Sequence, residues 1–430
     1  MGQARTTTLG CLSLASIAWF LTGGGDAWAL VGVPLGGMER PAAERSTGLI
    51  PERGGPFREA LSLPVPWGPG NRSCDPTYHP FSSPWRHLEG DLSRLERGLF
   101  ADAADGRWDE HSLLDAALVA SGLADVEALG RYRARFDELA AELEESGRVT
   151  GSPRRRAQAL FERMHRRILT GGYQIDATDL TLALDRGRGR FNCVSASVLF
   201  NCLAARFGLP ARGLEIPGHA MSRLTLPDGA VDVETTCPGW FRLMDDPKKQ
   251  AELVEKTIGS RLAAKSASAE RREVSDVELV ATIYYNRGVD LLGQKHFAEA
   301  VAANAKALRL DPSSTTARGN LLATINNWAV DAGSAGRHAE SVELLRRGIA
   351  LDPDYETLQV NYVHVHSQWI EELCGEERFR EALDLIARAA EDPVDHGYFS
   401  QARLDVSRRW ARTHLEAGRI EGAIRELSGD

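Results

Sequence analysis

Cys193 has the sequence surroundings of a nucleophile. It follows the glycine-containing segment RGRGR (186–190) and opens an apolar run that predicts a helix over 194–207. At the start of a helix, unpaired backbone N–H groups and the positive end of the helix dipole lower the pKa of a thiol and can hold an oxyanion. Cys202 lies nine residues further along. At roughly 100° per residue it is about half a turn away, so we expect it to face the core.

A histidine and two carboxylates follow Cys193 on segments that predict strands. His219 begins one such segment, which ends at the turn signal PDG (227–229). Asp232 and Glu234 lie in the strand after that turn. If the last two residues of PDG form the hairpin loop, both carboxylates share the face of His219, with Glu234 nearer to it. A thiol paired with a histidine that a carboxylate orients is the arrangement that activates cysteine for acyl transfer. The candidate catalytic residues are therefore Cys193, His219, Glu234 and, as the alternative acid, Asp232.

The chemistry that these residues support is attack of a thiolate on a carboxamide or peptide carbonyl. His219 would take the proton of the thiol, and the backbone N–H of Cys193 would stabilise the resulting oxyanion. The amine would then leave, with a thioester remaining on the enzyme. Water would complete hydrolysis and an amine would complete cross-linking, and the sequence does not choose between these outcomes. We expect an enzyme that acts on a peptide or amide substrate without a cofactor.

The elements before Cys193 are predicted to be amphipathic helices. Apolar residues recur at three-and-four spacing over 111–146, and a Ser-Pro pair opens a further helix over 153–169. Gly-Leu-Pro at 208–210 ends the helix that starts near Cys193, as expected of a glycine C-cap followed by proline. With the strands that follow, this pattern predicts an α+β domain over residues 85–245, rich in helices at first and ending in antiparallel strands.

The last part of the chain repeats with a period of 41 residues. The similar segments FAEAV, HAESV, FREAL and IEGAI begin at Phe297, His338, Phe379 and Ile420, and tryptophans recur at the same interval at Trp328, Trp369 and Trp410. Such in-phase copies predict an all-α domain of helical hairpins over residues 277–430, joined to the α+β domain by a linker helix at 246–276. The tryptophans are expected to pack between hairpins.

The segments around the candidate residues resemble the transglutaminase-like superfamily. The resemblance rests on the Gly-then-Cys helix entry at Cys193 and on the segments GLPAR (208–212), PGHA (217–220) and VDVETT (231–236). It implies a papain-like core in which Cys193 is the nucleophile, His219 is the general base and a carboxylate orients the imidazole. Among bacterial relatives, the resemblance points more often to a protease or amidase.

The repeats resemble tetratricopeptide repeats. The first copy has small or terminating residues of that 34-residue pattern at Gly288, Ala300, Ala307 and Pro312. The order of a helical stretch, a Cys/His core and such repeats is similar to bacterial proteins that append tetratricopeptide repeats to a transglutaminase-like core. This order implies that the repeats bind a protein or peptide partner. A competing hypothesis is a catalytically inactive transglutaminase-like protein that acts as an interaction scaffold through its repeats.

The N-terminal residues 1–29 are predicted to form a secretory signal peptide. The stretch over 9–21 is apolar, and Ala27-Trp28-Ala29 fits a small-x-small cleavage site. An uncleaved membrane anchor is the alternative, because the uncharged run is about as long as a bilayer span. Residues 30–84 are rich in proline and glycine and predict a linker. We therefore expect an exported protein, periplasmic or secreted, that contacts a membrane only if the N-terminal segment is retained as an anchor.

Composition narrows the class of partner. The chain has 430 residues, with 51 Lys and Arg against 60 Asp and Glu and a net charge of −9, so nucleic acid is not expected as a partner. No cluster of histidine and cysteine has the spacing of a metal site, so no metal is expected. Five of the six cysteines would remain after cleavage, which leaves at least one thiol unpaired. Cys74, Cys237 and Cys374 could pair in combinations that the sequence does not decide.

Overall fold

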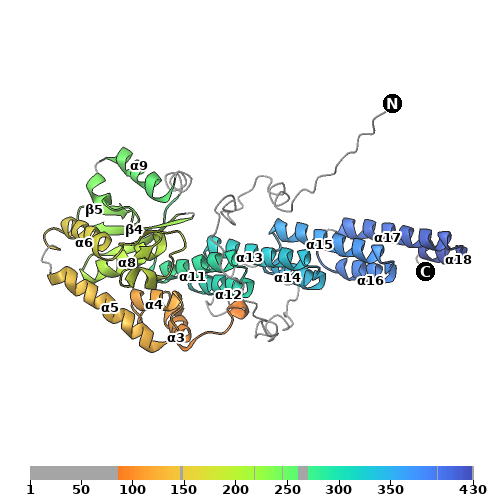
Figure 1. The fold of residues 1–430 in the computed structure, drawn as a ribbon, viewed down its shortest axis with the longest axis horizontal. Coiled ribbons are helices and arrows are strands. Elements are labelled where there is room, and N and C mark those ends of the chain that lie inside the picture. The colour runs from red at the N-terminus through yellow and green to blue at the C-terminus, as the bar shows by residue number, and fades with distance from the viewer. Residues whose placement is uncertain are drawn as a thin grey trace, which may run out of the picture. The chain divides into compact units, whose positions relative to one another are not determined.

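The computed structural model describes residues 86–145, 149–216, 218–244, 246–259, 270–394 and 396–428 (Figure 1). The predicted signal peptide, the predicted linker over 30–84 and Cys74 lie outside the described residues. Among the helices that are described, none is both long enough and apolar enough to cross a membrane. The same residues hold no group of His, Cys, Asp or Glu side chains suited to a metal ion.

The elements up to Cys193 are mostly helices. In chain order they are η3 (Arg86–Leu88), α3 (Arg94–Asp102), η4 (Ala103–Asp105), α4 (Leu113–Ala120), α5 (Val126–Glu145), α6 (Pro153–Arg167), β1 (Gly172–Tyr173), α7 (Leu180–Leu184) and β2 (Arg190–Phe191). Serine side chains cap α3, α4 and α6 by accepting a hydrogen bond from a backbone N–H in the first turn. Ala157, Leu160, Phe161 and Met164 form a buried face of α6, as an amphipathic helix requires.

An antiparallel sheet follows, with the strand order β5-β4-β3-β6. Its strands are β3 (Ala211–Ile216), β4 (His219–Leu226), β5 (Gly229–Val233) and β6 (Arg272–Val274). Leu226 pairs with Gly229, so the loop is Pro227-Asp228 and the predicted register is wrong by two residues. The fixed φ of proline suits the first loop position. A shift of two residues keeps every side chain on the face expected for it, and Val231 and Val233 are buried.

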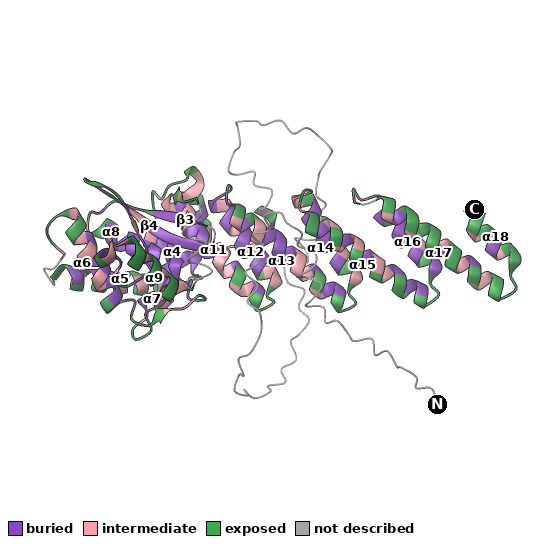
Figure 2. Ribbon diagram, turned by 90° about the horizontal axis from the view of Figure 1, so that it is seen from above, coloured by how far each residue is buried: buried purple, intermediate pink, exposed green. Residues whose placement is uncertain are grey.

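Helix α8 (Cys193–Arg206) is the central helix of this α+β part. Its residues from Cys193 to Ala204 are all buried (Figure 2), because α4, α6, α7, β3 and β4 contact it. The helix begins one residue earlier than predicted, since Asn192 caps it. It ends before Gly208, whose φ of +65° is a conformation that favours glycine.

The predicted linker helix at 246–276 is not helical throughout. Helix α9 (Pro247–Ile258) follows η5 (Trp240–Leu243), but β6 then joins the sheet by pairing with β3. The α+β part therefore extends beyond the predicted boundary at residue 245. A strand as short as β6 has too few residues for a recognisable alternation, which is why the sequence pattern did not indicate it.

Four helical hairpins follow β6 in the described chain. They consist of α11 (Asp276–Gly293) with α12 (Phe297–Leu310), α13 (Thr315–Ser334) with α14 (His338–Leu351), α15 (Glu356–Gly375) with α16 (Phe379–Ala389), and α17 (His396–Glu416) with α18 (Ile420–Ser428). The second helix of each hairpin starts at the first residue of one of the repeated segments, so the period of 41 residues corresponds to one helical hairpin. Trp328, Trp369 and Trp410 each stack on the first residue of the preceding second helix, with ring centroids 6.1, 5.9 and 6.1 Å apart. They pack between hairpins, as predicted.

The first hairpin packs directly on the α+β part. Helix α11 contacts α4, α8, β3 and β6 as well as α12. Arg272 of β6 forms ion pairs with Glu215 of β3, at 2.6 Å, and with Asp311 at the end of α12. The buried residues on both sides belong to one hydrophobic cluster. The predicted boundary at 276/277 therefore does not separate two cores.

Candidate active site

Cys193 is held at the first position of α8 by the residue that caps this helix. The Asn192 side chain accepts hydrogen bonds from the N–H groups of Val194 and Ser195, at 2.9 and 3.0 Å. Its own amide group donates to Thr178 Oγ1 at 2.8 Å, which ties the cap to the loop before α7. Cys193 itself is 8% exposed. As the first residue of the helix it has no carbonyl partner within α8 for its N–H, which suits that group to bind an oxyanion.

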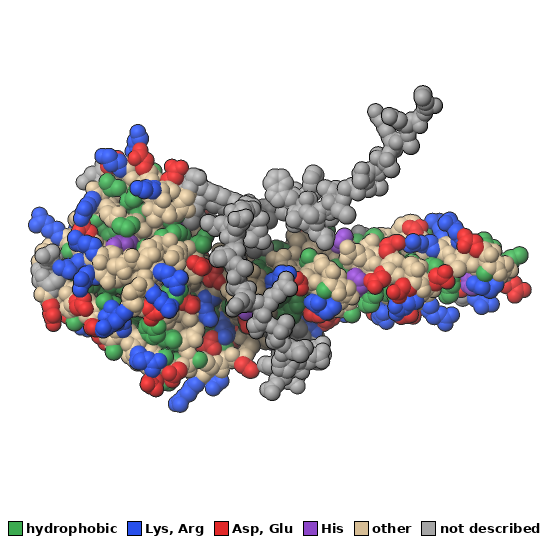
Figure 3. All heavy atoms as spheres, in the orientation of Figure 1, with side chains coloured by type: hydrophobic (Ala, Val, Ile, Leu, Met, Phe, Trp, Pro, Cys, Tyr) green, Lys and Arg blue, Asp and Glu red, His purple; other side chains and the backbone are tan. Residues whose placement is uncertain are grey.

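The segment RGRGR before Cys193 makes close backbone contacts. Gly189 has a φ of +53°, and a Cβ there would lie 2.2 Å from the carbonyl oxygen of Ile168. Arg186 forms an ion pair with a glutamate of α5 at 2.7 Å, and Arg190 donates to the glutamine after β1 at 3.2 Å. On the face drawn in Figure 3, basic and acidic side chains of the α+β part are interspersed. The segment therefore positions β2 and Cys193.

His219 and Glu234 form a buried ion pair. His219 Nε2 lies 2.7 Å from Glu234 Oε2, and the two side chains are 0% and 1% exposed. The other carboxylate oxygen, Oε1, accepts hydrogen bonds from the N–H and the Oγ1 hydroxyl of Thr236, at 3.1 and 2.6 Å. Burial alone would raise the pKa of the Glu234 carboxyl, but the charge of His219 and these hydrogen bonds hold it below its ordinary value. The carboxylate is ionised and fixed against the imidazole.

Because Nε2 binds Glu234, Nδ1 is the ring nitrogen of His219 that remains for Cys193. Nδ1 is buried and has no hydrogen-bond partner among the described residues. Burial disfavours the charged ring, but the charge of Glu234 and then the neighbouring Cys193 outweigh it and raise the pKa of His219 to about 10. Cys193 therefore lies close enough to act on the ring, although no hydrogen bond of ordinary length joins these two described side chains. The structure brings together three of the four candidate residues.

Asp232, the alternative acid, forms its hydrogen bonds with two arginines. Its carboxylate accepts hydrogen bonds from Arg223 at 2.7 and 3.0 Å and from Arg271 at 2.5 Å. Burial would raise the pKa of Asp232, but the two guanidinium groups lower it. Within the described residues, Glu234 is the carboxylate that contacts His219, and Asp232 belongs to a separate arginine network.

Two residues that sequence reasoning missed hold the segment after β5. His165 Nε2 lies 3.0 Å from the carbonyl oxygen of Thr235, and Ser197 Oγ lies 2.8 Å from Thr235 Oγ1. Burial lowers the pKa of His165 to about 4, so the neutral ring donates through Nε2–H. A histidine beside the apolar face of an amphipathic helix is usually an ordinary core residue, and its sequence context carries no signal for this contact. The two contacts fix the backbone next to Glu234.

Two tyrosines from different elements interact electrostatically with Cys193. Tyr173 of β1 pairs with Phe191 of β2, and their ring centroids are 6.3 Å apart. Tyr285 of α11 donates from its hydroxyl to Glu215 Oε1 at 2.9 Å. Burial, followed by interaction with nearby acidic groups that include Cys193, raises the pKa of both hydroxyls. Sequence patterns did not indicate either residue, because β1 is only two residues long and α11 was assigned to the repeats.

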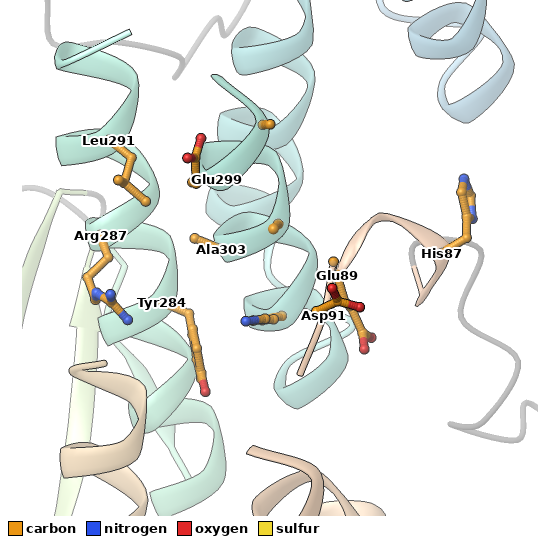
Figure 4. Close-up of a pocket in the computed structure, with 12 residues that line it drawn as sticks. His87, Glu89, Asp91, Tyr284, Arg287, Leu291, Glu299 and Ala303 are labelled. Carbon is orange, nitrogen blue, oxygen red and sulfur yellow. The ribbon is translucent and has the colours of Figure 1, made fainter. Parts of the chain in front are cut away.

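A separate cavity of about 470 Å³ lies between the segment after η3 and the first hairpin (Figure 4). Arg287 of α11 and Lys306 of α12 line it, and none of the four candidate catalytic residues does. Lys306 forms an ion pair with Glu96 at 2.7 Å, and Arg287 forms one with Asp179 at 3.5 Å. Since both cations are already paired, the lining does not point to one class of ligand.

The four described cysteines are all unpaired and buried. Cys237 and Cys374, which could have paired with each other, do not. Burial is the main cause that raises the pKa of Cys202, and it raises that of Cys237 to about 12. These two thiols therefore stay protonated in the interior. The position of Cys193 is different, since it is the first residue of a helix.

Comparison with known proteins identifies a family for this part of the chain. Residues 130–275 match the family described as the Transglutaminase-like superfamily. The comparisons with curated proteins and with solved structures found no match. The matched range includes Cys193, His219 and Glu234, and the hairpins from α11 onward lie outside it. Residues 130–275 are therefore a transglutaminase-like core.

Proposed function

We propose that this transglutaminase-like core catalyses thiol-dependent acyl transfer or hydrolysis at an amide or peptide bond. Cys193 is the nucleophile, His219 the general base and Glu234 the group that orients the histidine. The observation that carries the proposal is the buried contact of His219 Nε2 with Glu234 at 2.7 Å, which leaves Nδ1 for the thiol. Acyl transfer by a thiol needs this combination of a proton acceptor beside the sulfur and a fixed counter-charge for the imidazolium.

In the proposed mechanism, Nδ1 of His219 takes the proton of Cys193 and the sulfur attacks the carbonyl carbon. The electron pair of the C=O bond moves to oxygen, and the N–H of Cys193 at the start of α8 stabilises that charge. The imidazolium then gives its proton to the leaving nitrogen as the C–N bond breaks and a thioester remains. Water or a second amine, deprotonated by His219, attacks the thioester and releases the sulfur. Glu234 stays ionised and stabilises the imidazolium.

We also propose that the hairpins bind a protein or peptide partner. Their first helices expose apolar side chains, with Val289 41%, Val330 43% and Val360 39% exposed. Exposed apolar residues on successive hairpins offer an extended contact surface to a polypeptide. Peptides selected from a library on the full chain should bind more weakly to Val330→Glu than to the wild type. Equal binding to the two proteins would place the contact elsewhere.

The burial of the site favours a competing function, that of an inactive scaffold. Cys193 is 8% and His219 4% exposed, so a substrate reaches the sulfur only if neighbouring side chains move. A scaffold needs no reactive thiol, whereas the proposed enzyme does. The reactivity of Cys193 therefore separates the two functions.

The test is the rate of iodoacetamide labelling in the full chain between pH 5 and 9, with labelled peptides identified by mass spectrometry. We expect Cys193 to react fastest and to slow at least tenfold in His219→Ala, because the imidazole takes the proton of the thiol. Cys202, on the same helix and also buried, is the internal control. Labelling of Cys193 no faster than of Cys202, and unchanged in His219→Ala, would reject the enzyme in favour of the scaffold.

A further inference from the structure

We propose that Tyr173 is a further catalytic residue of this site, whose hydroxyl donates a hydrogen bond to the oxyanion alongside the backbone N–H of Cys193. The inference rests on the proposed function, since it assigns a second donor to the same reaction. It comes from the placement of β1, the short strand that lies beside the residues leading into Cys193.

The strand pairing holds Tyr173 close to the nucleophile. β1 and β2 run parallel, with Tyr173 opposite Phe191, and the N–H of Gln174 donates to the carbonyl oxygen of Phe191 at 2.8 Å. Neighbouring strands lie about 4.8 Å apart. Cys193 follows Phe191 by two residues, or roughly 7 Å of extended chain. A side chain as long as tyrosine therefore reaches the surroundings of the sulfur from the β1 position.

The backbone around β1 fixes this placement. The N–H of Gly171 donates to the carbonyl oxygen of Gly189 at 3.0 Å, and a Cβ on Gly171 would lie 1.8 Å from the carbonyl oxygen of Arg188. The edge-on packing of the Tyr173 ring against Phe191, at an interplanar angle of 75°, sets the direction of the phenol. Strand pairing and ring packing together hold the phenol without using its hydroxyl.

The Tyr173 hydroxyl forms no hydrogen bond with any described residue, and therefore its proton is available to a ligand. Burial is the largest cause that raises its pKa, and interaction with Cys193, Glu234 and Cys237 follows. These groups place the hydroxyl within the electrostatic environment of the candidate site. They also keep it protonated over the working pH range, which is the state that donates a hydrogen bond.

Tyr285 provides a matched comparison. It is also a tyrosine in the electrostatic environment of Cys193, but its hydroxyl already donates to Glu215 at 2.9 Å. A hydroxyl has a single proton to donate, so Tyr285 has none for an oxyanion. The same Tyr→Phe substitution therefore removes an available donor at Tyr173 and a donor already bound to Glu215 at Tyr285. Both substitutions keep the aromatic ring in place.

The role of Tyr173 is confined to steps in which negative charge develops on the carbonyl oxygen. Acylation by an ester or amide passes through a tetrahedral oxyanion, and loss of one donor to such an oxyanion costs about 100- to 1000-fold in rate. Alkylation by iodoacetamide displaces iodide directly and forms no oxyanion. The two reactions use the same thiolate, so their comparison isolates the hydroxyl of Tyr173 from thiol activation.

The experiment measures both reactions on the full chain in the wild type, Tyr173→Phe and Tyr285→Phe, with p-nitrophenyl acetate as the acylating probe. We expect Tyr173→Phe to slow the release of p-nitrophenolate about 100-fold or more, with labelling of Cys193 by iodoacetamide within about threefold of wild type. Tyr285→Phe should change both rates by less than about threefold, because it removes no donor to the oxyanion.

Two outcomes would overturn the role of Tyr173 with the proposed function intact: unchanged acylation in Tyr173→Phe, or an equal loss of acylation and alkylation, which marks a structural effect. A wild type with neither acylation nor His219-dependent alkylation would overturn the proposed function, and this inference with it.

Discussion

Around Cys193, polar side chains from distant parts of the chain meet in the interior, whereas the hairpins repeat one aromatic contact between neighbours. His165 and Thr235, which lie 70 residues apart, are joined by a hydrogen bond of 3.0 Å, and Ser197 and Thr235 by one of 2.8 Å. In the hairpins, a ring that starts one helix stacks on the tryptophan of the next helix, at 5.9 to 6.1 Å.

The difference reflects the kind of interaction that stabilises each region. A buried polar group without a partner costs roughly 1–3 kcal/mol, so the contacts around Glu234 are retained only where several elements place them together. Stacked hairpins need apolar contact with the adjacent hairpin alone, and their stability is close to a sum over neighbours. The first region thus depends on the whole α+β fold, whereas damage to the second should remain local.

The largest expected effect follows from removing the carboxylate that contacts His219. Glu234→Gln keeps the size of the side chain but removes the charge that holds the imidazolium, and we expect the rate of acylation by p-nitrophenyl acetate to fall about 10⁴-fold. Asp232→Asn is the matched control, because Asp232 binds Arg223 and Arg271 and not the histidine. We expect the acylation rate of this control to lie within about threefold of the wild-type rate, because a partly exposed ion pair contributes little. Equal losses of acylation rate in the two variants would mean that Glu234 has no role that Asp232 lacks.

A smaller effect is expected from breaking one aromatic stack. Trp369→Ala removes a partly buried ring that stacks on His338, and should destabilise the third hairpin by about 3 kcal/mol. Hydrogen exchange should speed up in α14 and α15, which pack on this ring. Labelling of Cys193 should stay at the wild-type rate, because no contact around the candidate site involves this hairpin among the described residues. A slowed labelling rate would show that the hairpins and the core do not behave independently.

The same difference explains what could be predicted from the sequence. The hairpins follow from a local repeat, and the repeated segments of the sequence begin where the second helices of the hairpins begin. Cys193 and His219 were recognisable because each begins an element, and local signals mark such positions. The hairpin loop was misplaced by one residue, which shifts the cross-strand pairing by two, since PDG offers two choices of loop and cross-strand pairing decides between them.

The remaining parts of the candidate site could not be predicted because their contacts are not local. Tyr173 is held opposite Phe191, two residues before Cys193, by a strand pair of two residues on each side, too short to leave a periodic pattern. The hydrogen bond of His165 to Thr235 depends on how α6 packs beside the sheet. Such contacts follow from the tertiary fold, and the sequence pattern of either partner does not contain them.

The smallest expected effect is a dependence of stability on pH, which we expect for the core around Cys193 and not for the hairpins. His219 has a pKa raised from 6.5 to about 10: burial opposes the shift, but Glu234 and Cys193 outweigh it. Because the folded state binds this proton more tightly, the pair stabilises the core fully below about pH 6.5, and the contribution is lost as the pH rises through about 10. The pKa of Glu234 is lowered, so its contribution is present above about 4.5 and is lost as the pH falls further.

Melting temperatures of the full chain measured from pH 6 to 10.5 check this difference. Relative to the wild type, His219→Phe should lower the melting temperature most near neutral pH, and the gap should narrow toward pH 10.5. Trp328→Ala, which removes a ring stacked on Phe297, should lower it by an amount that does not depend on pH, because neither ring ionises. A His219→Phe gap that stays constant up to pH 10.5 would mean that the histidine contributes through packing, and that its ion pair with Glu234 adds nothing to the stability of the core.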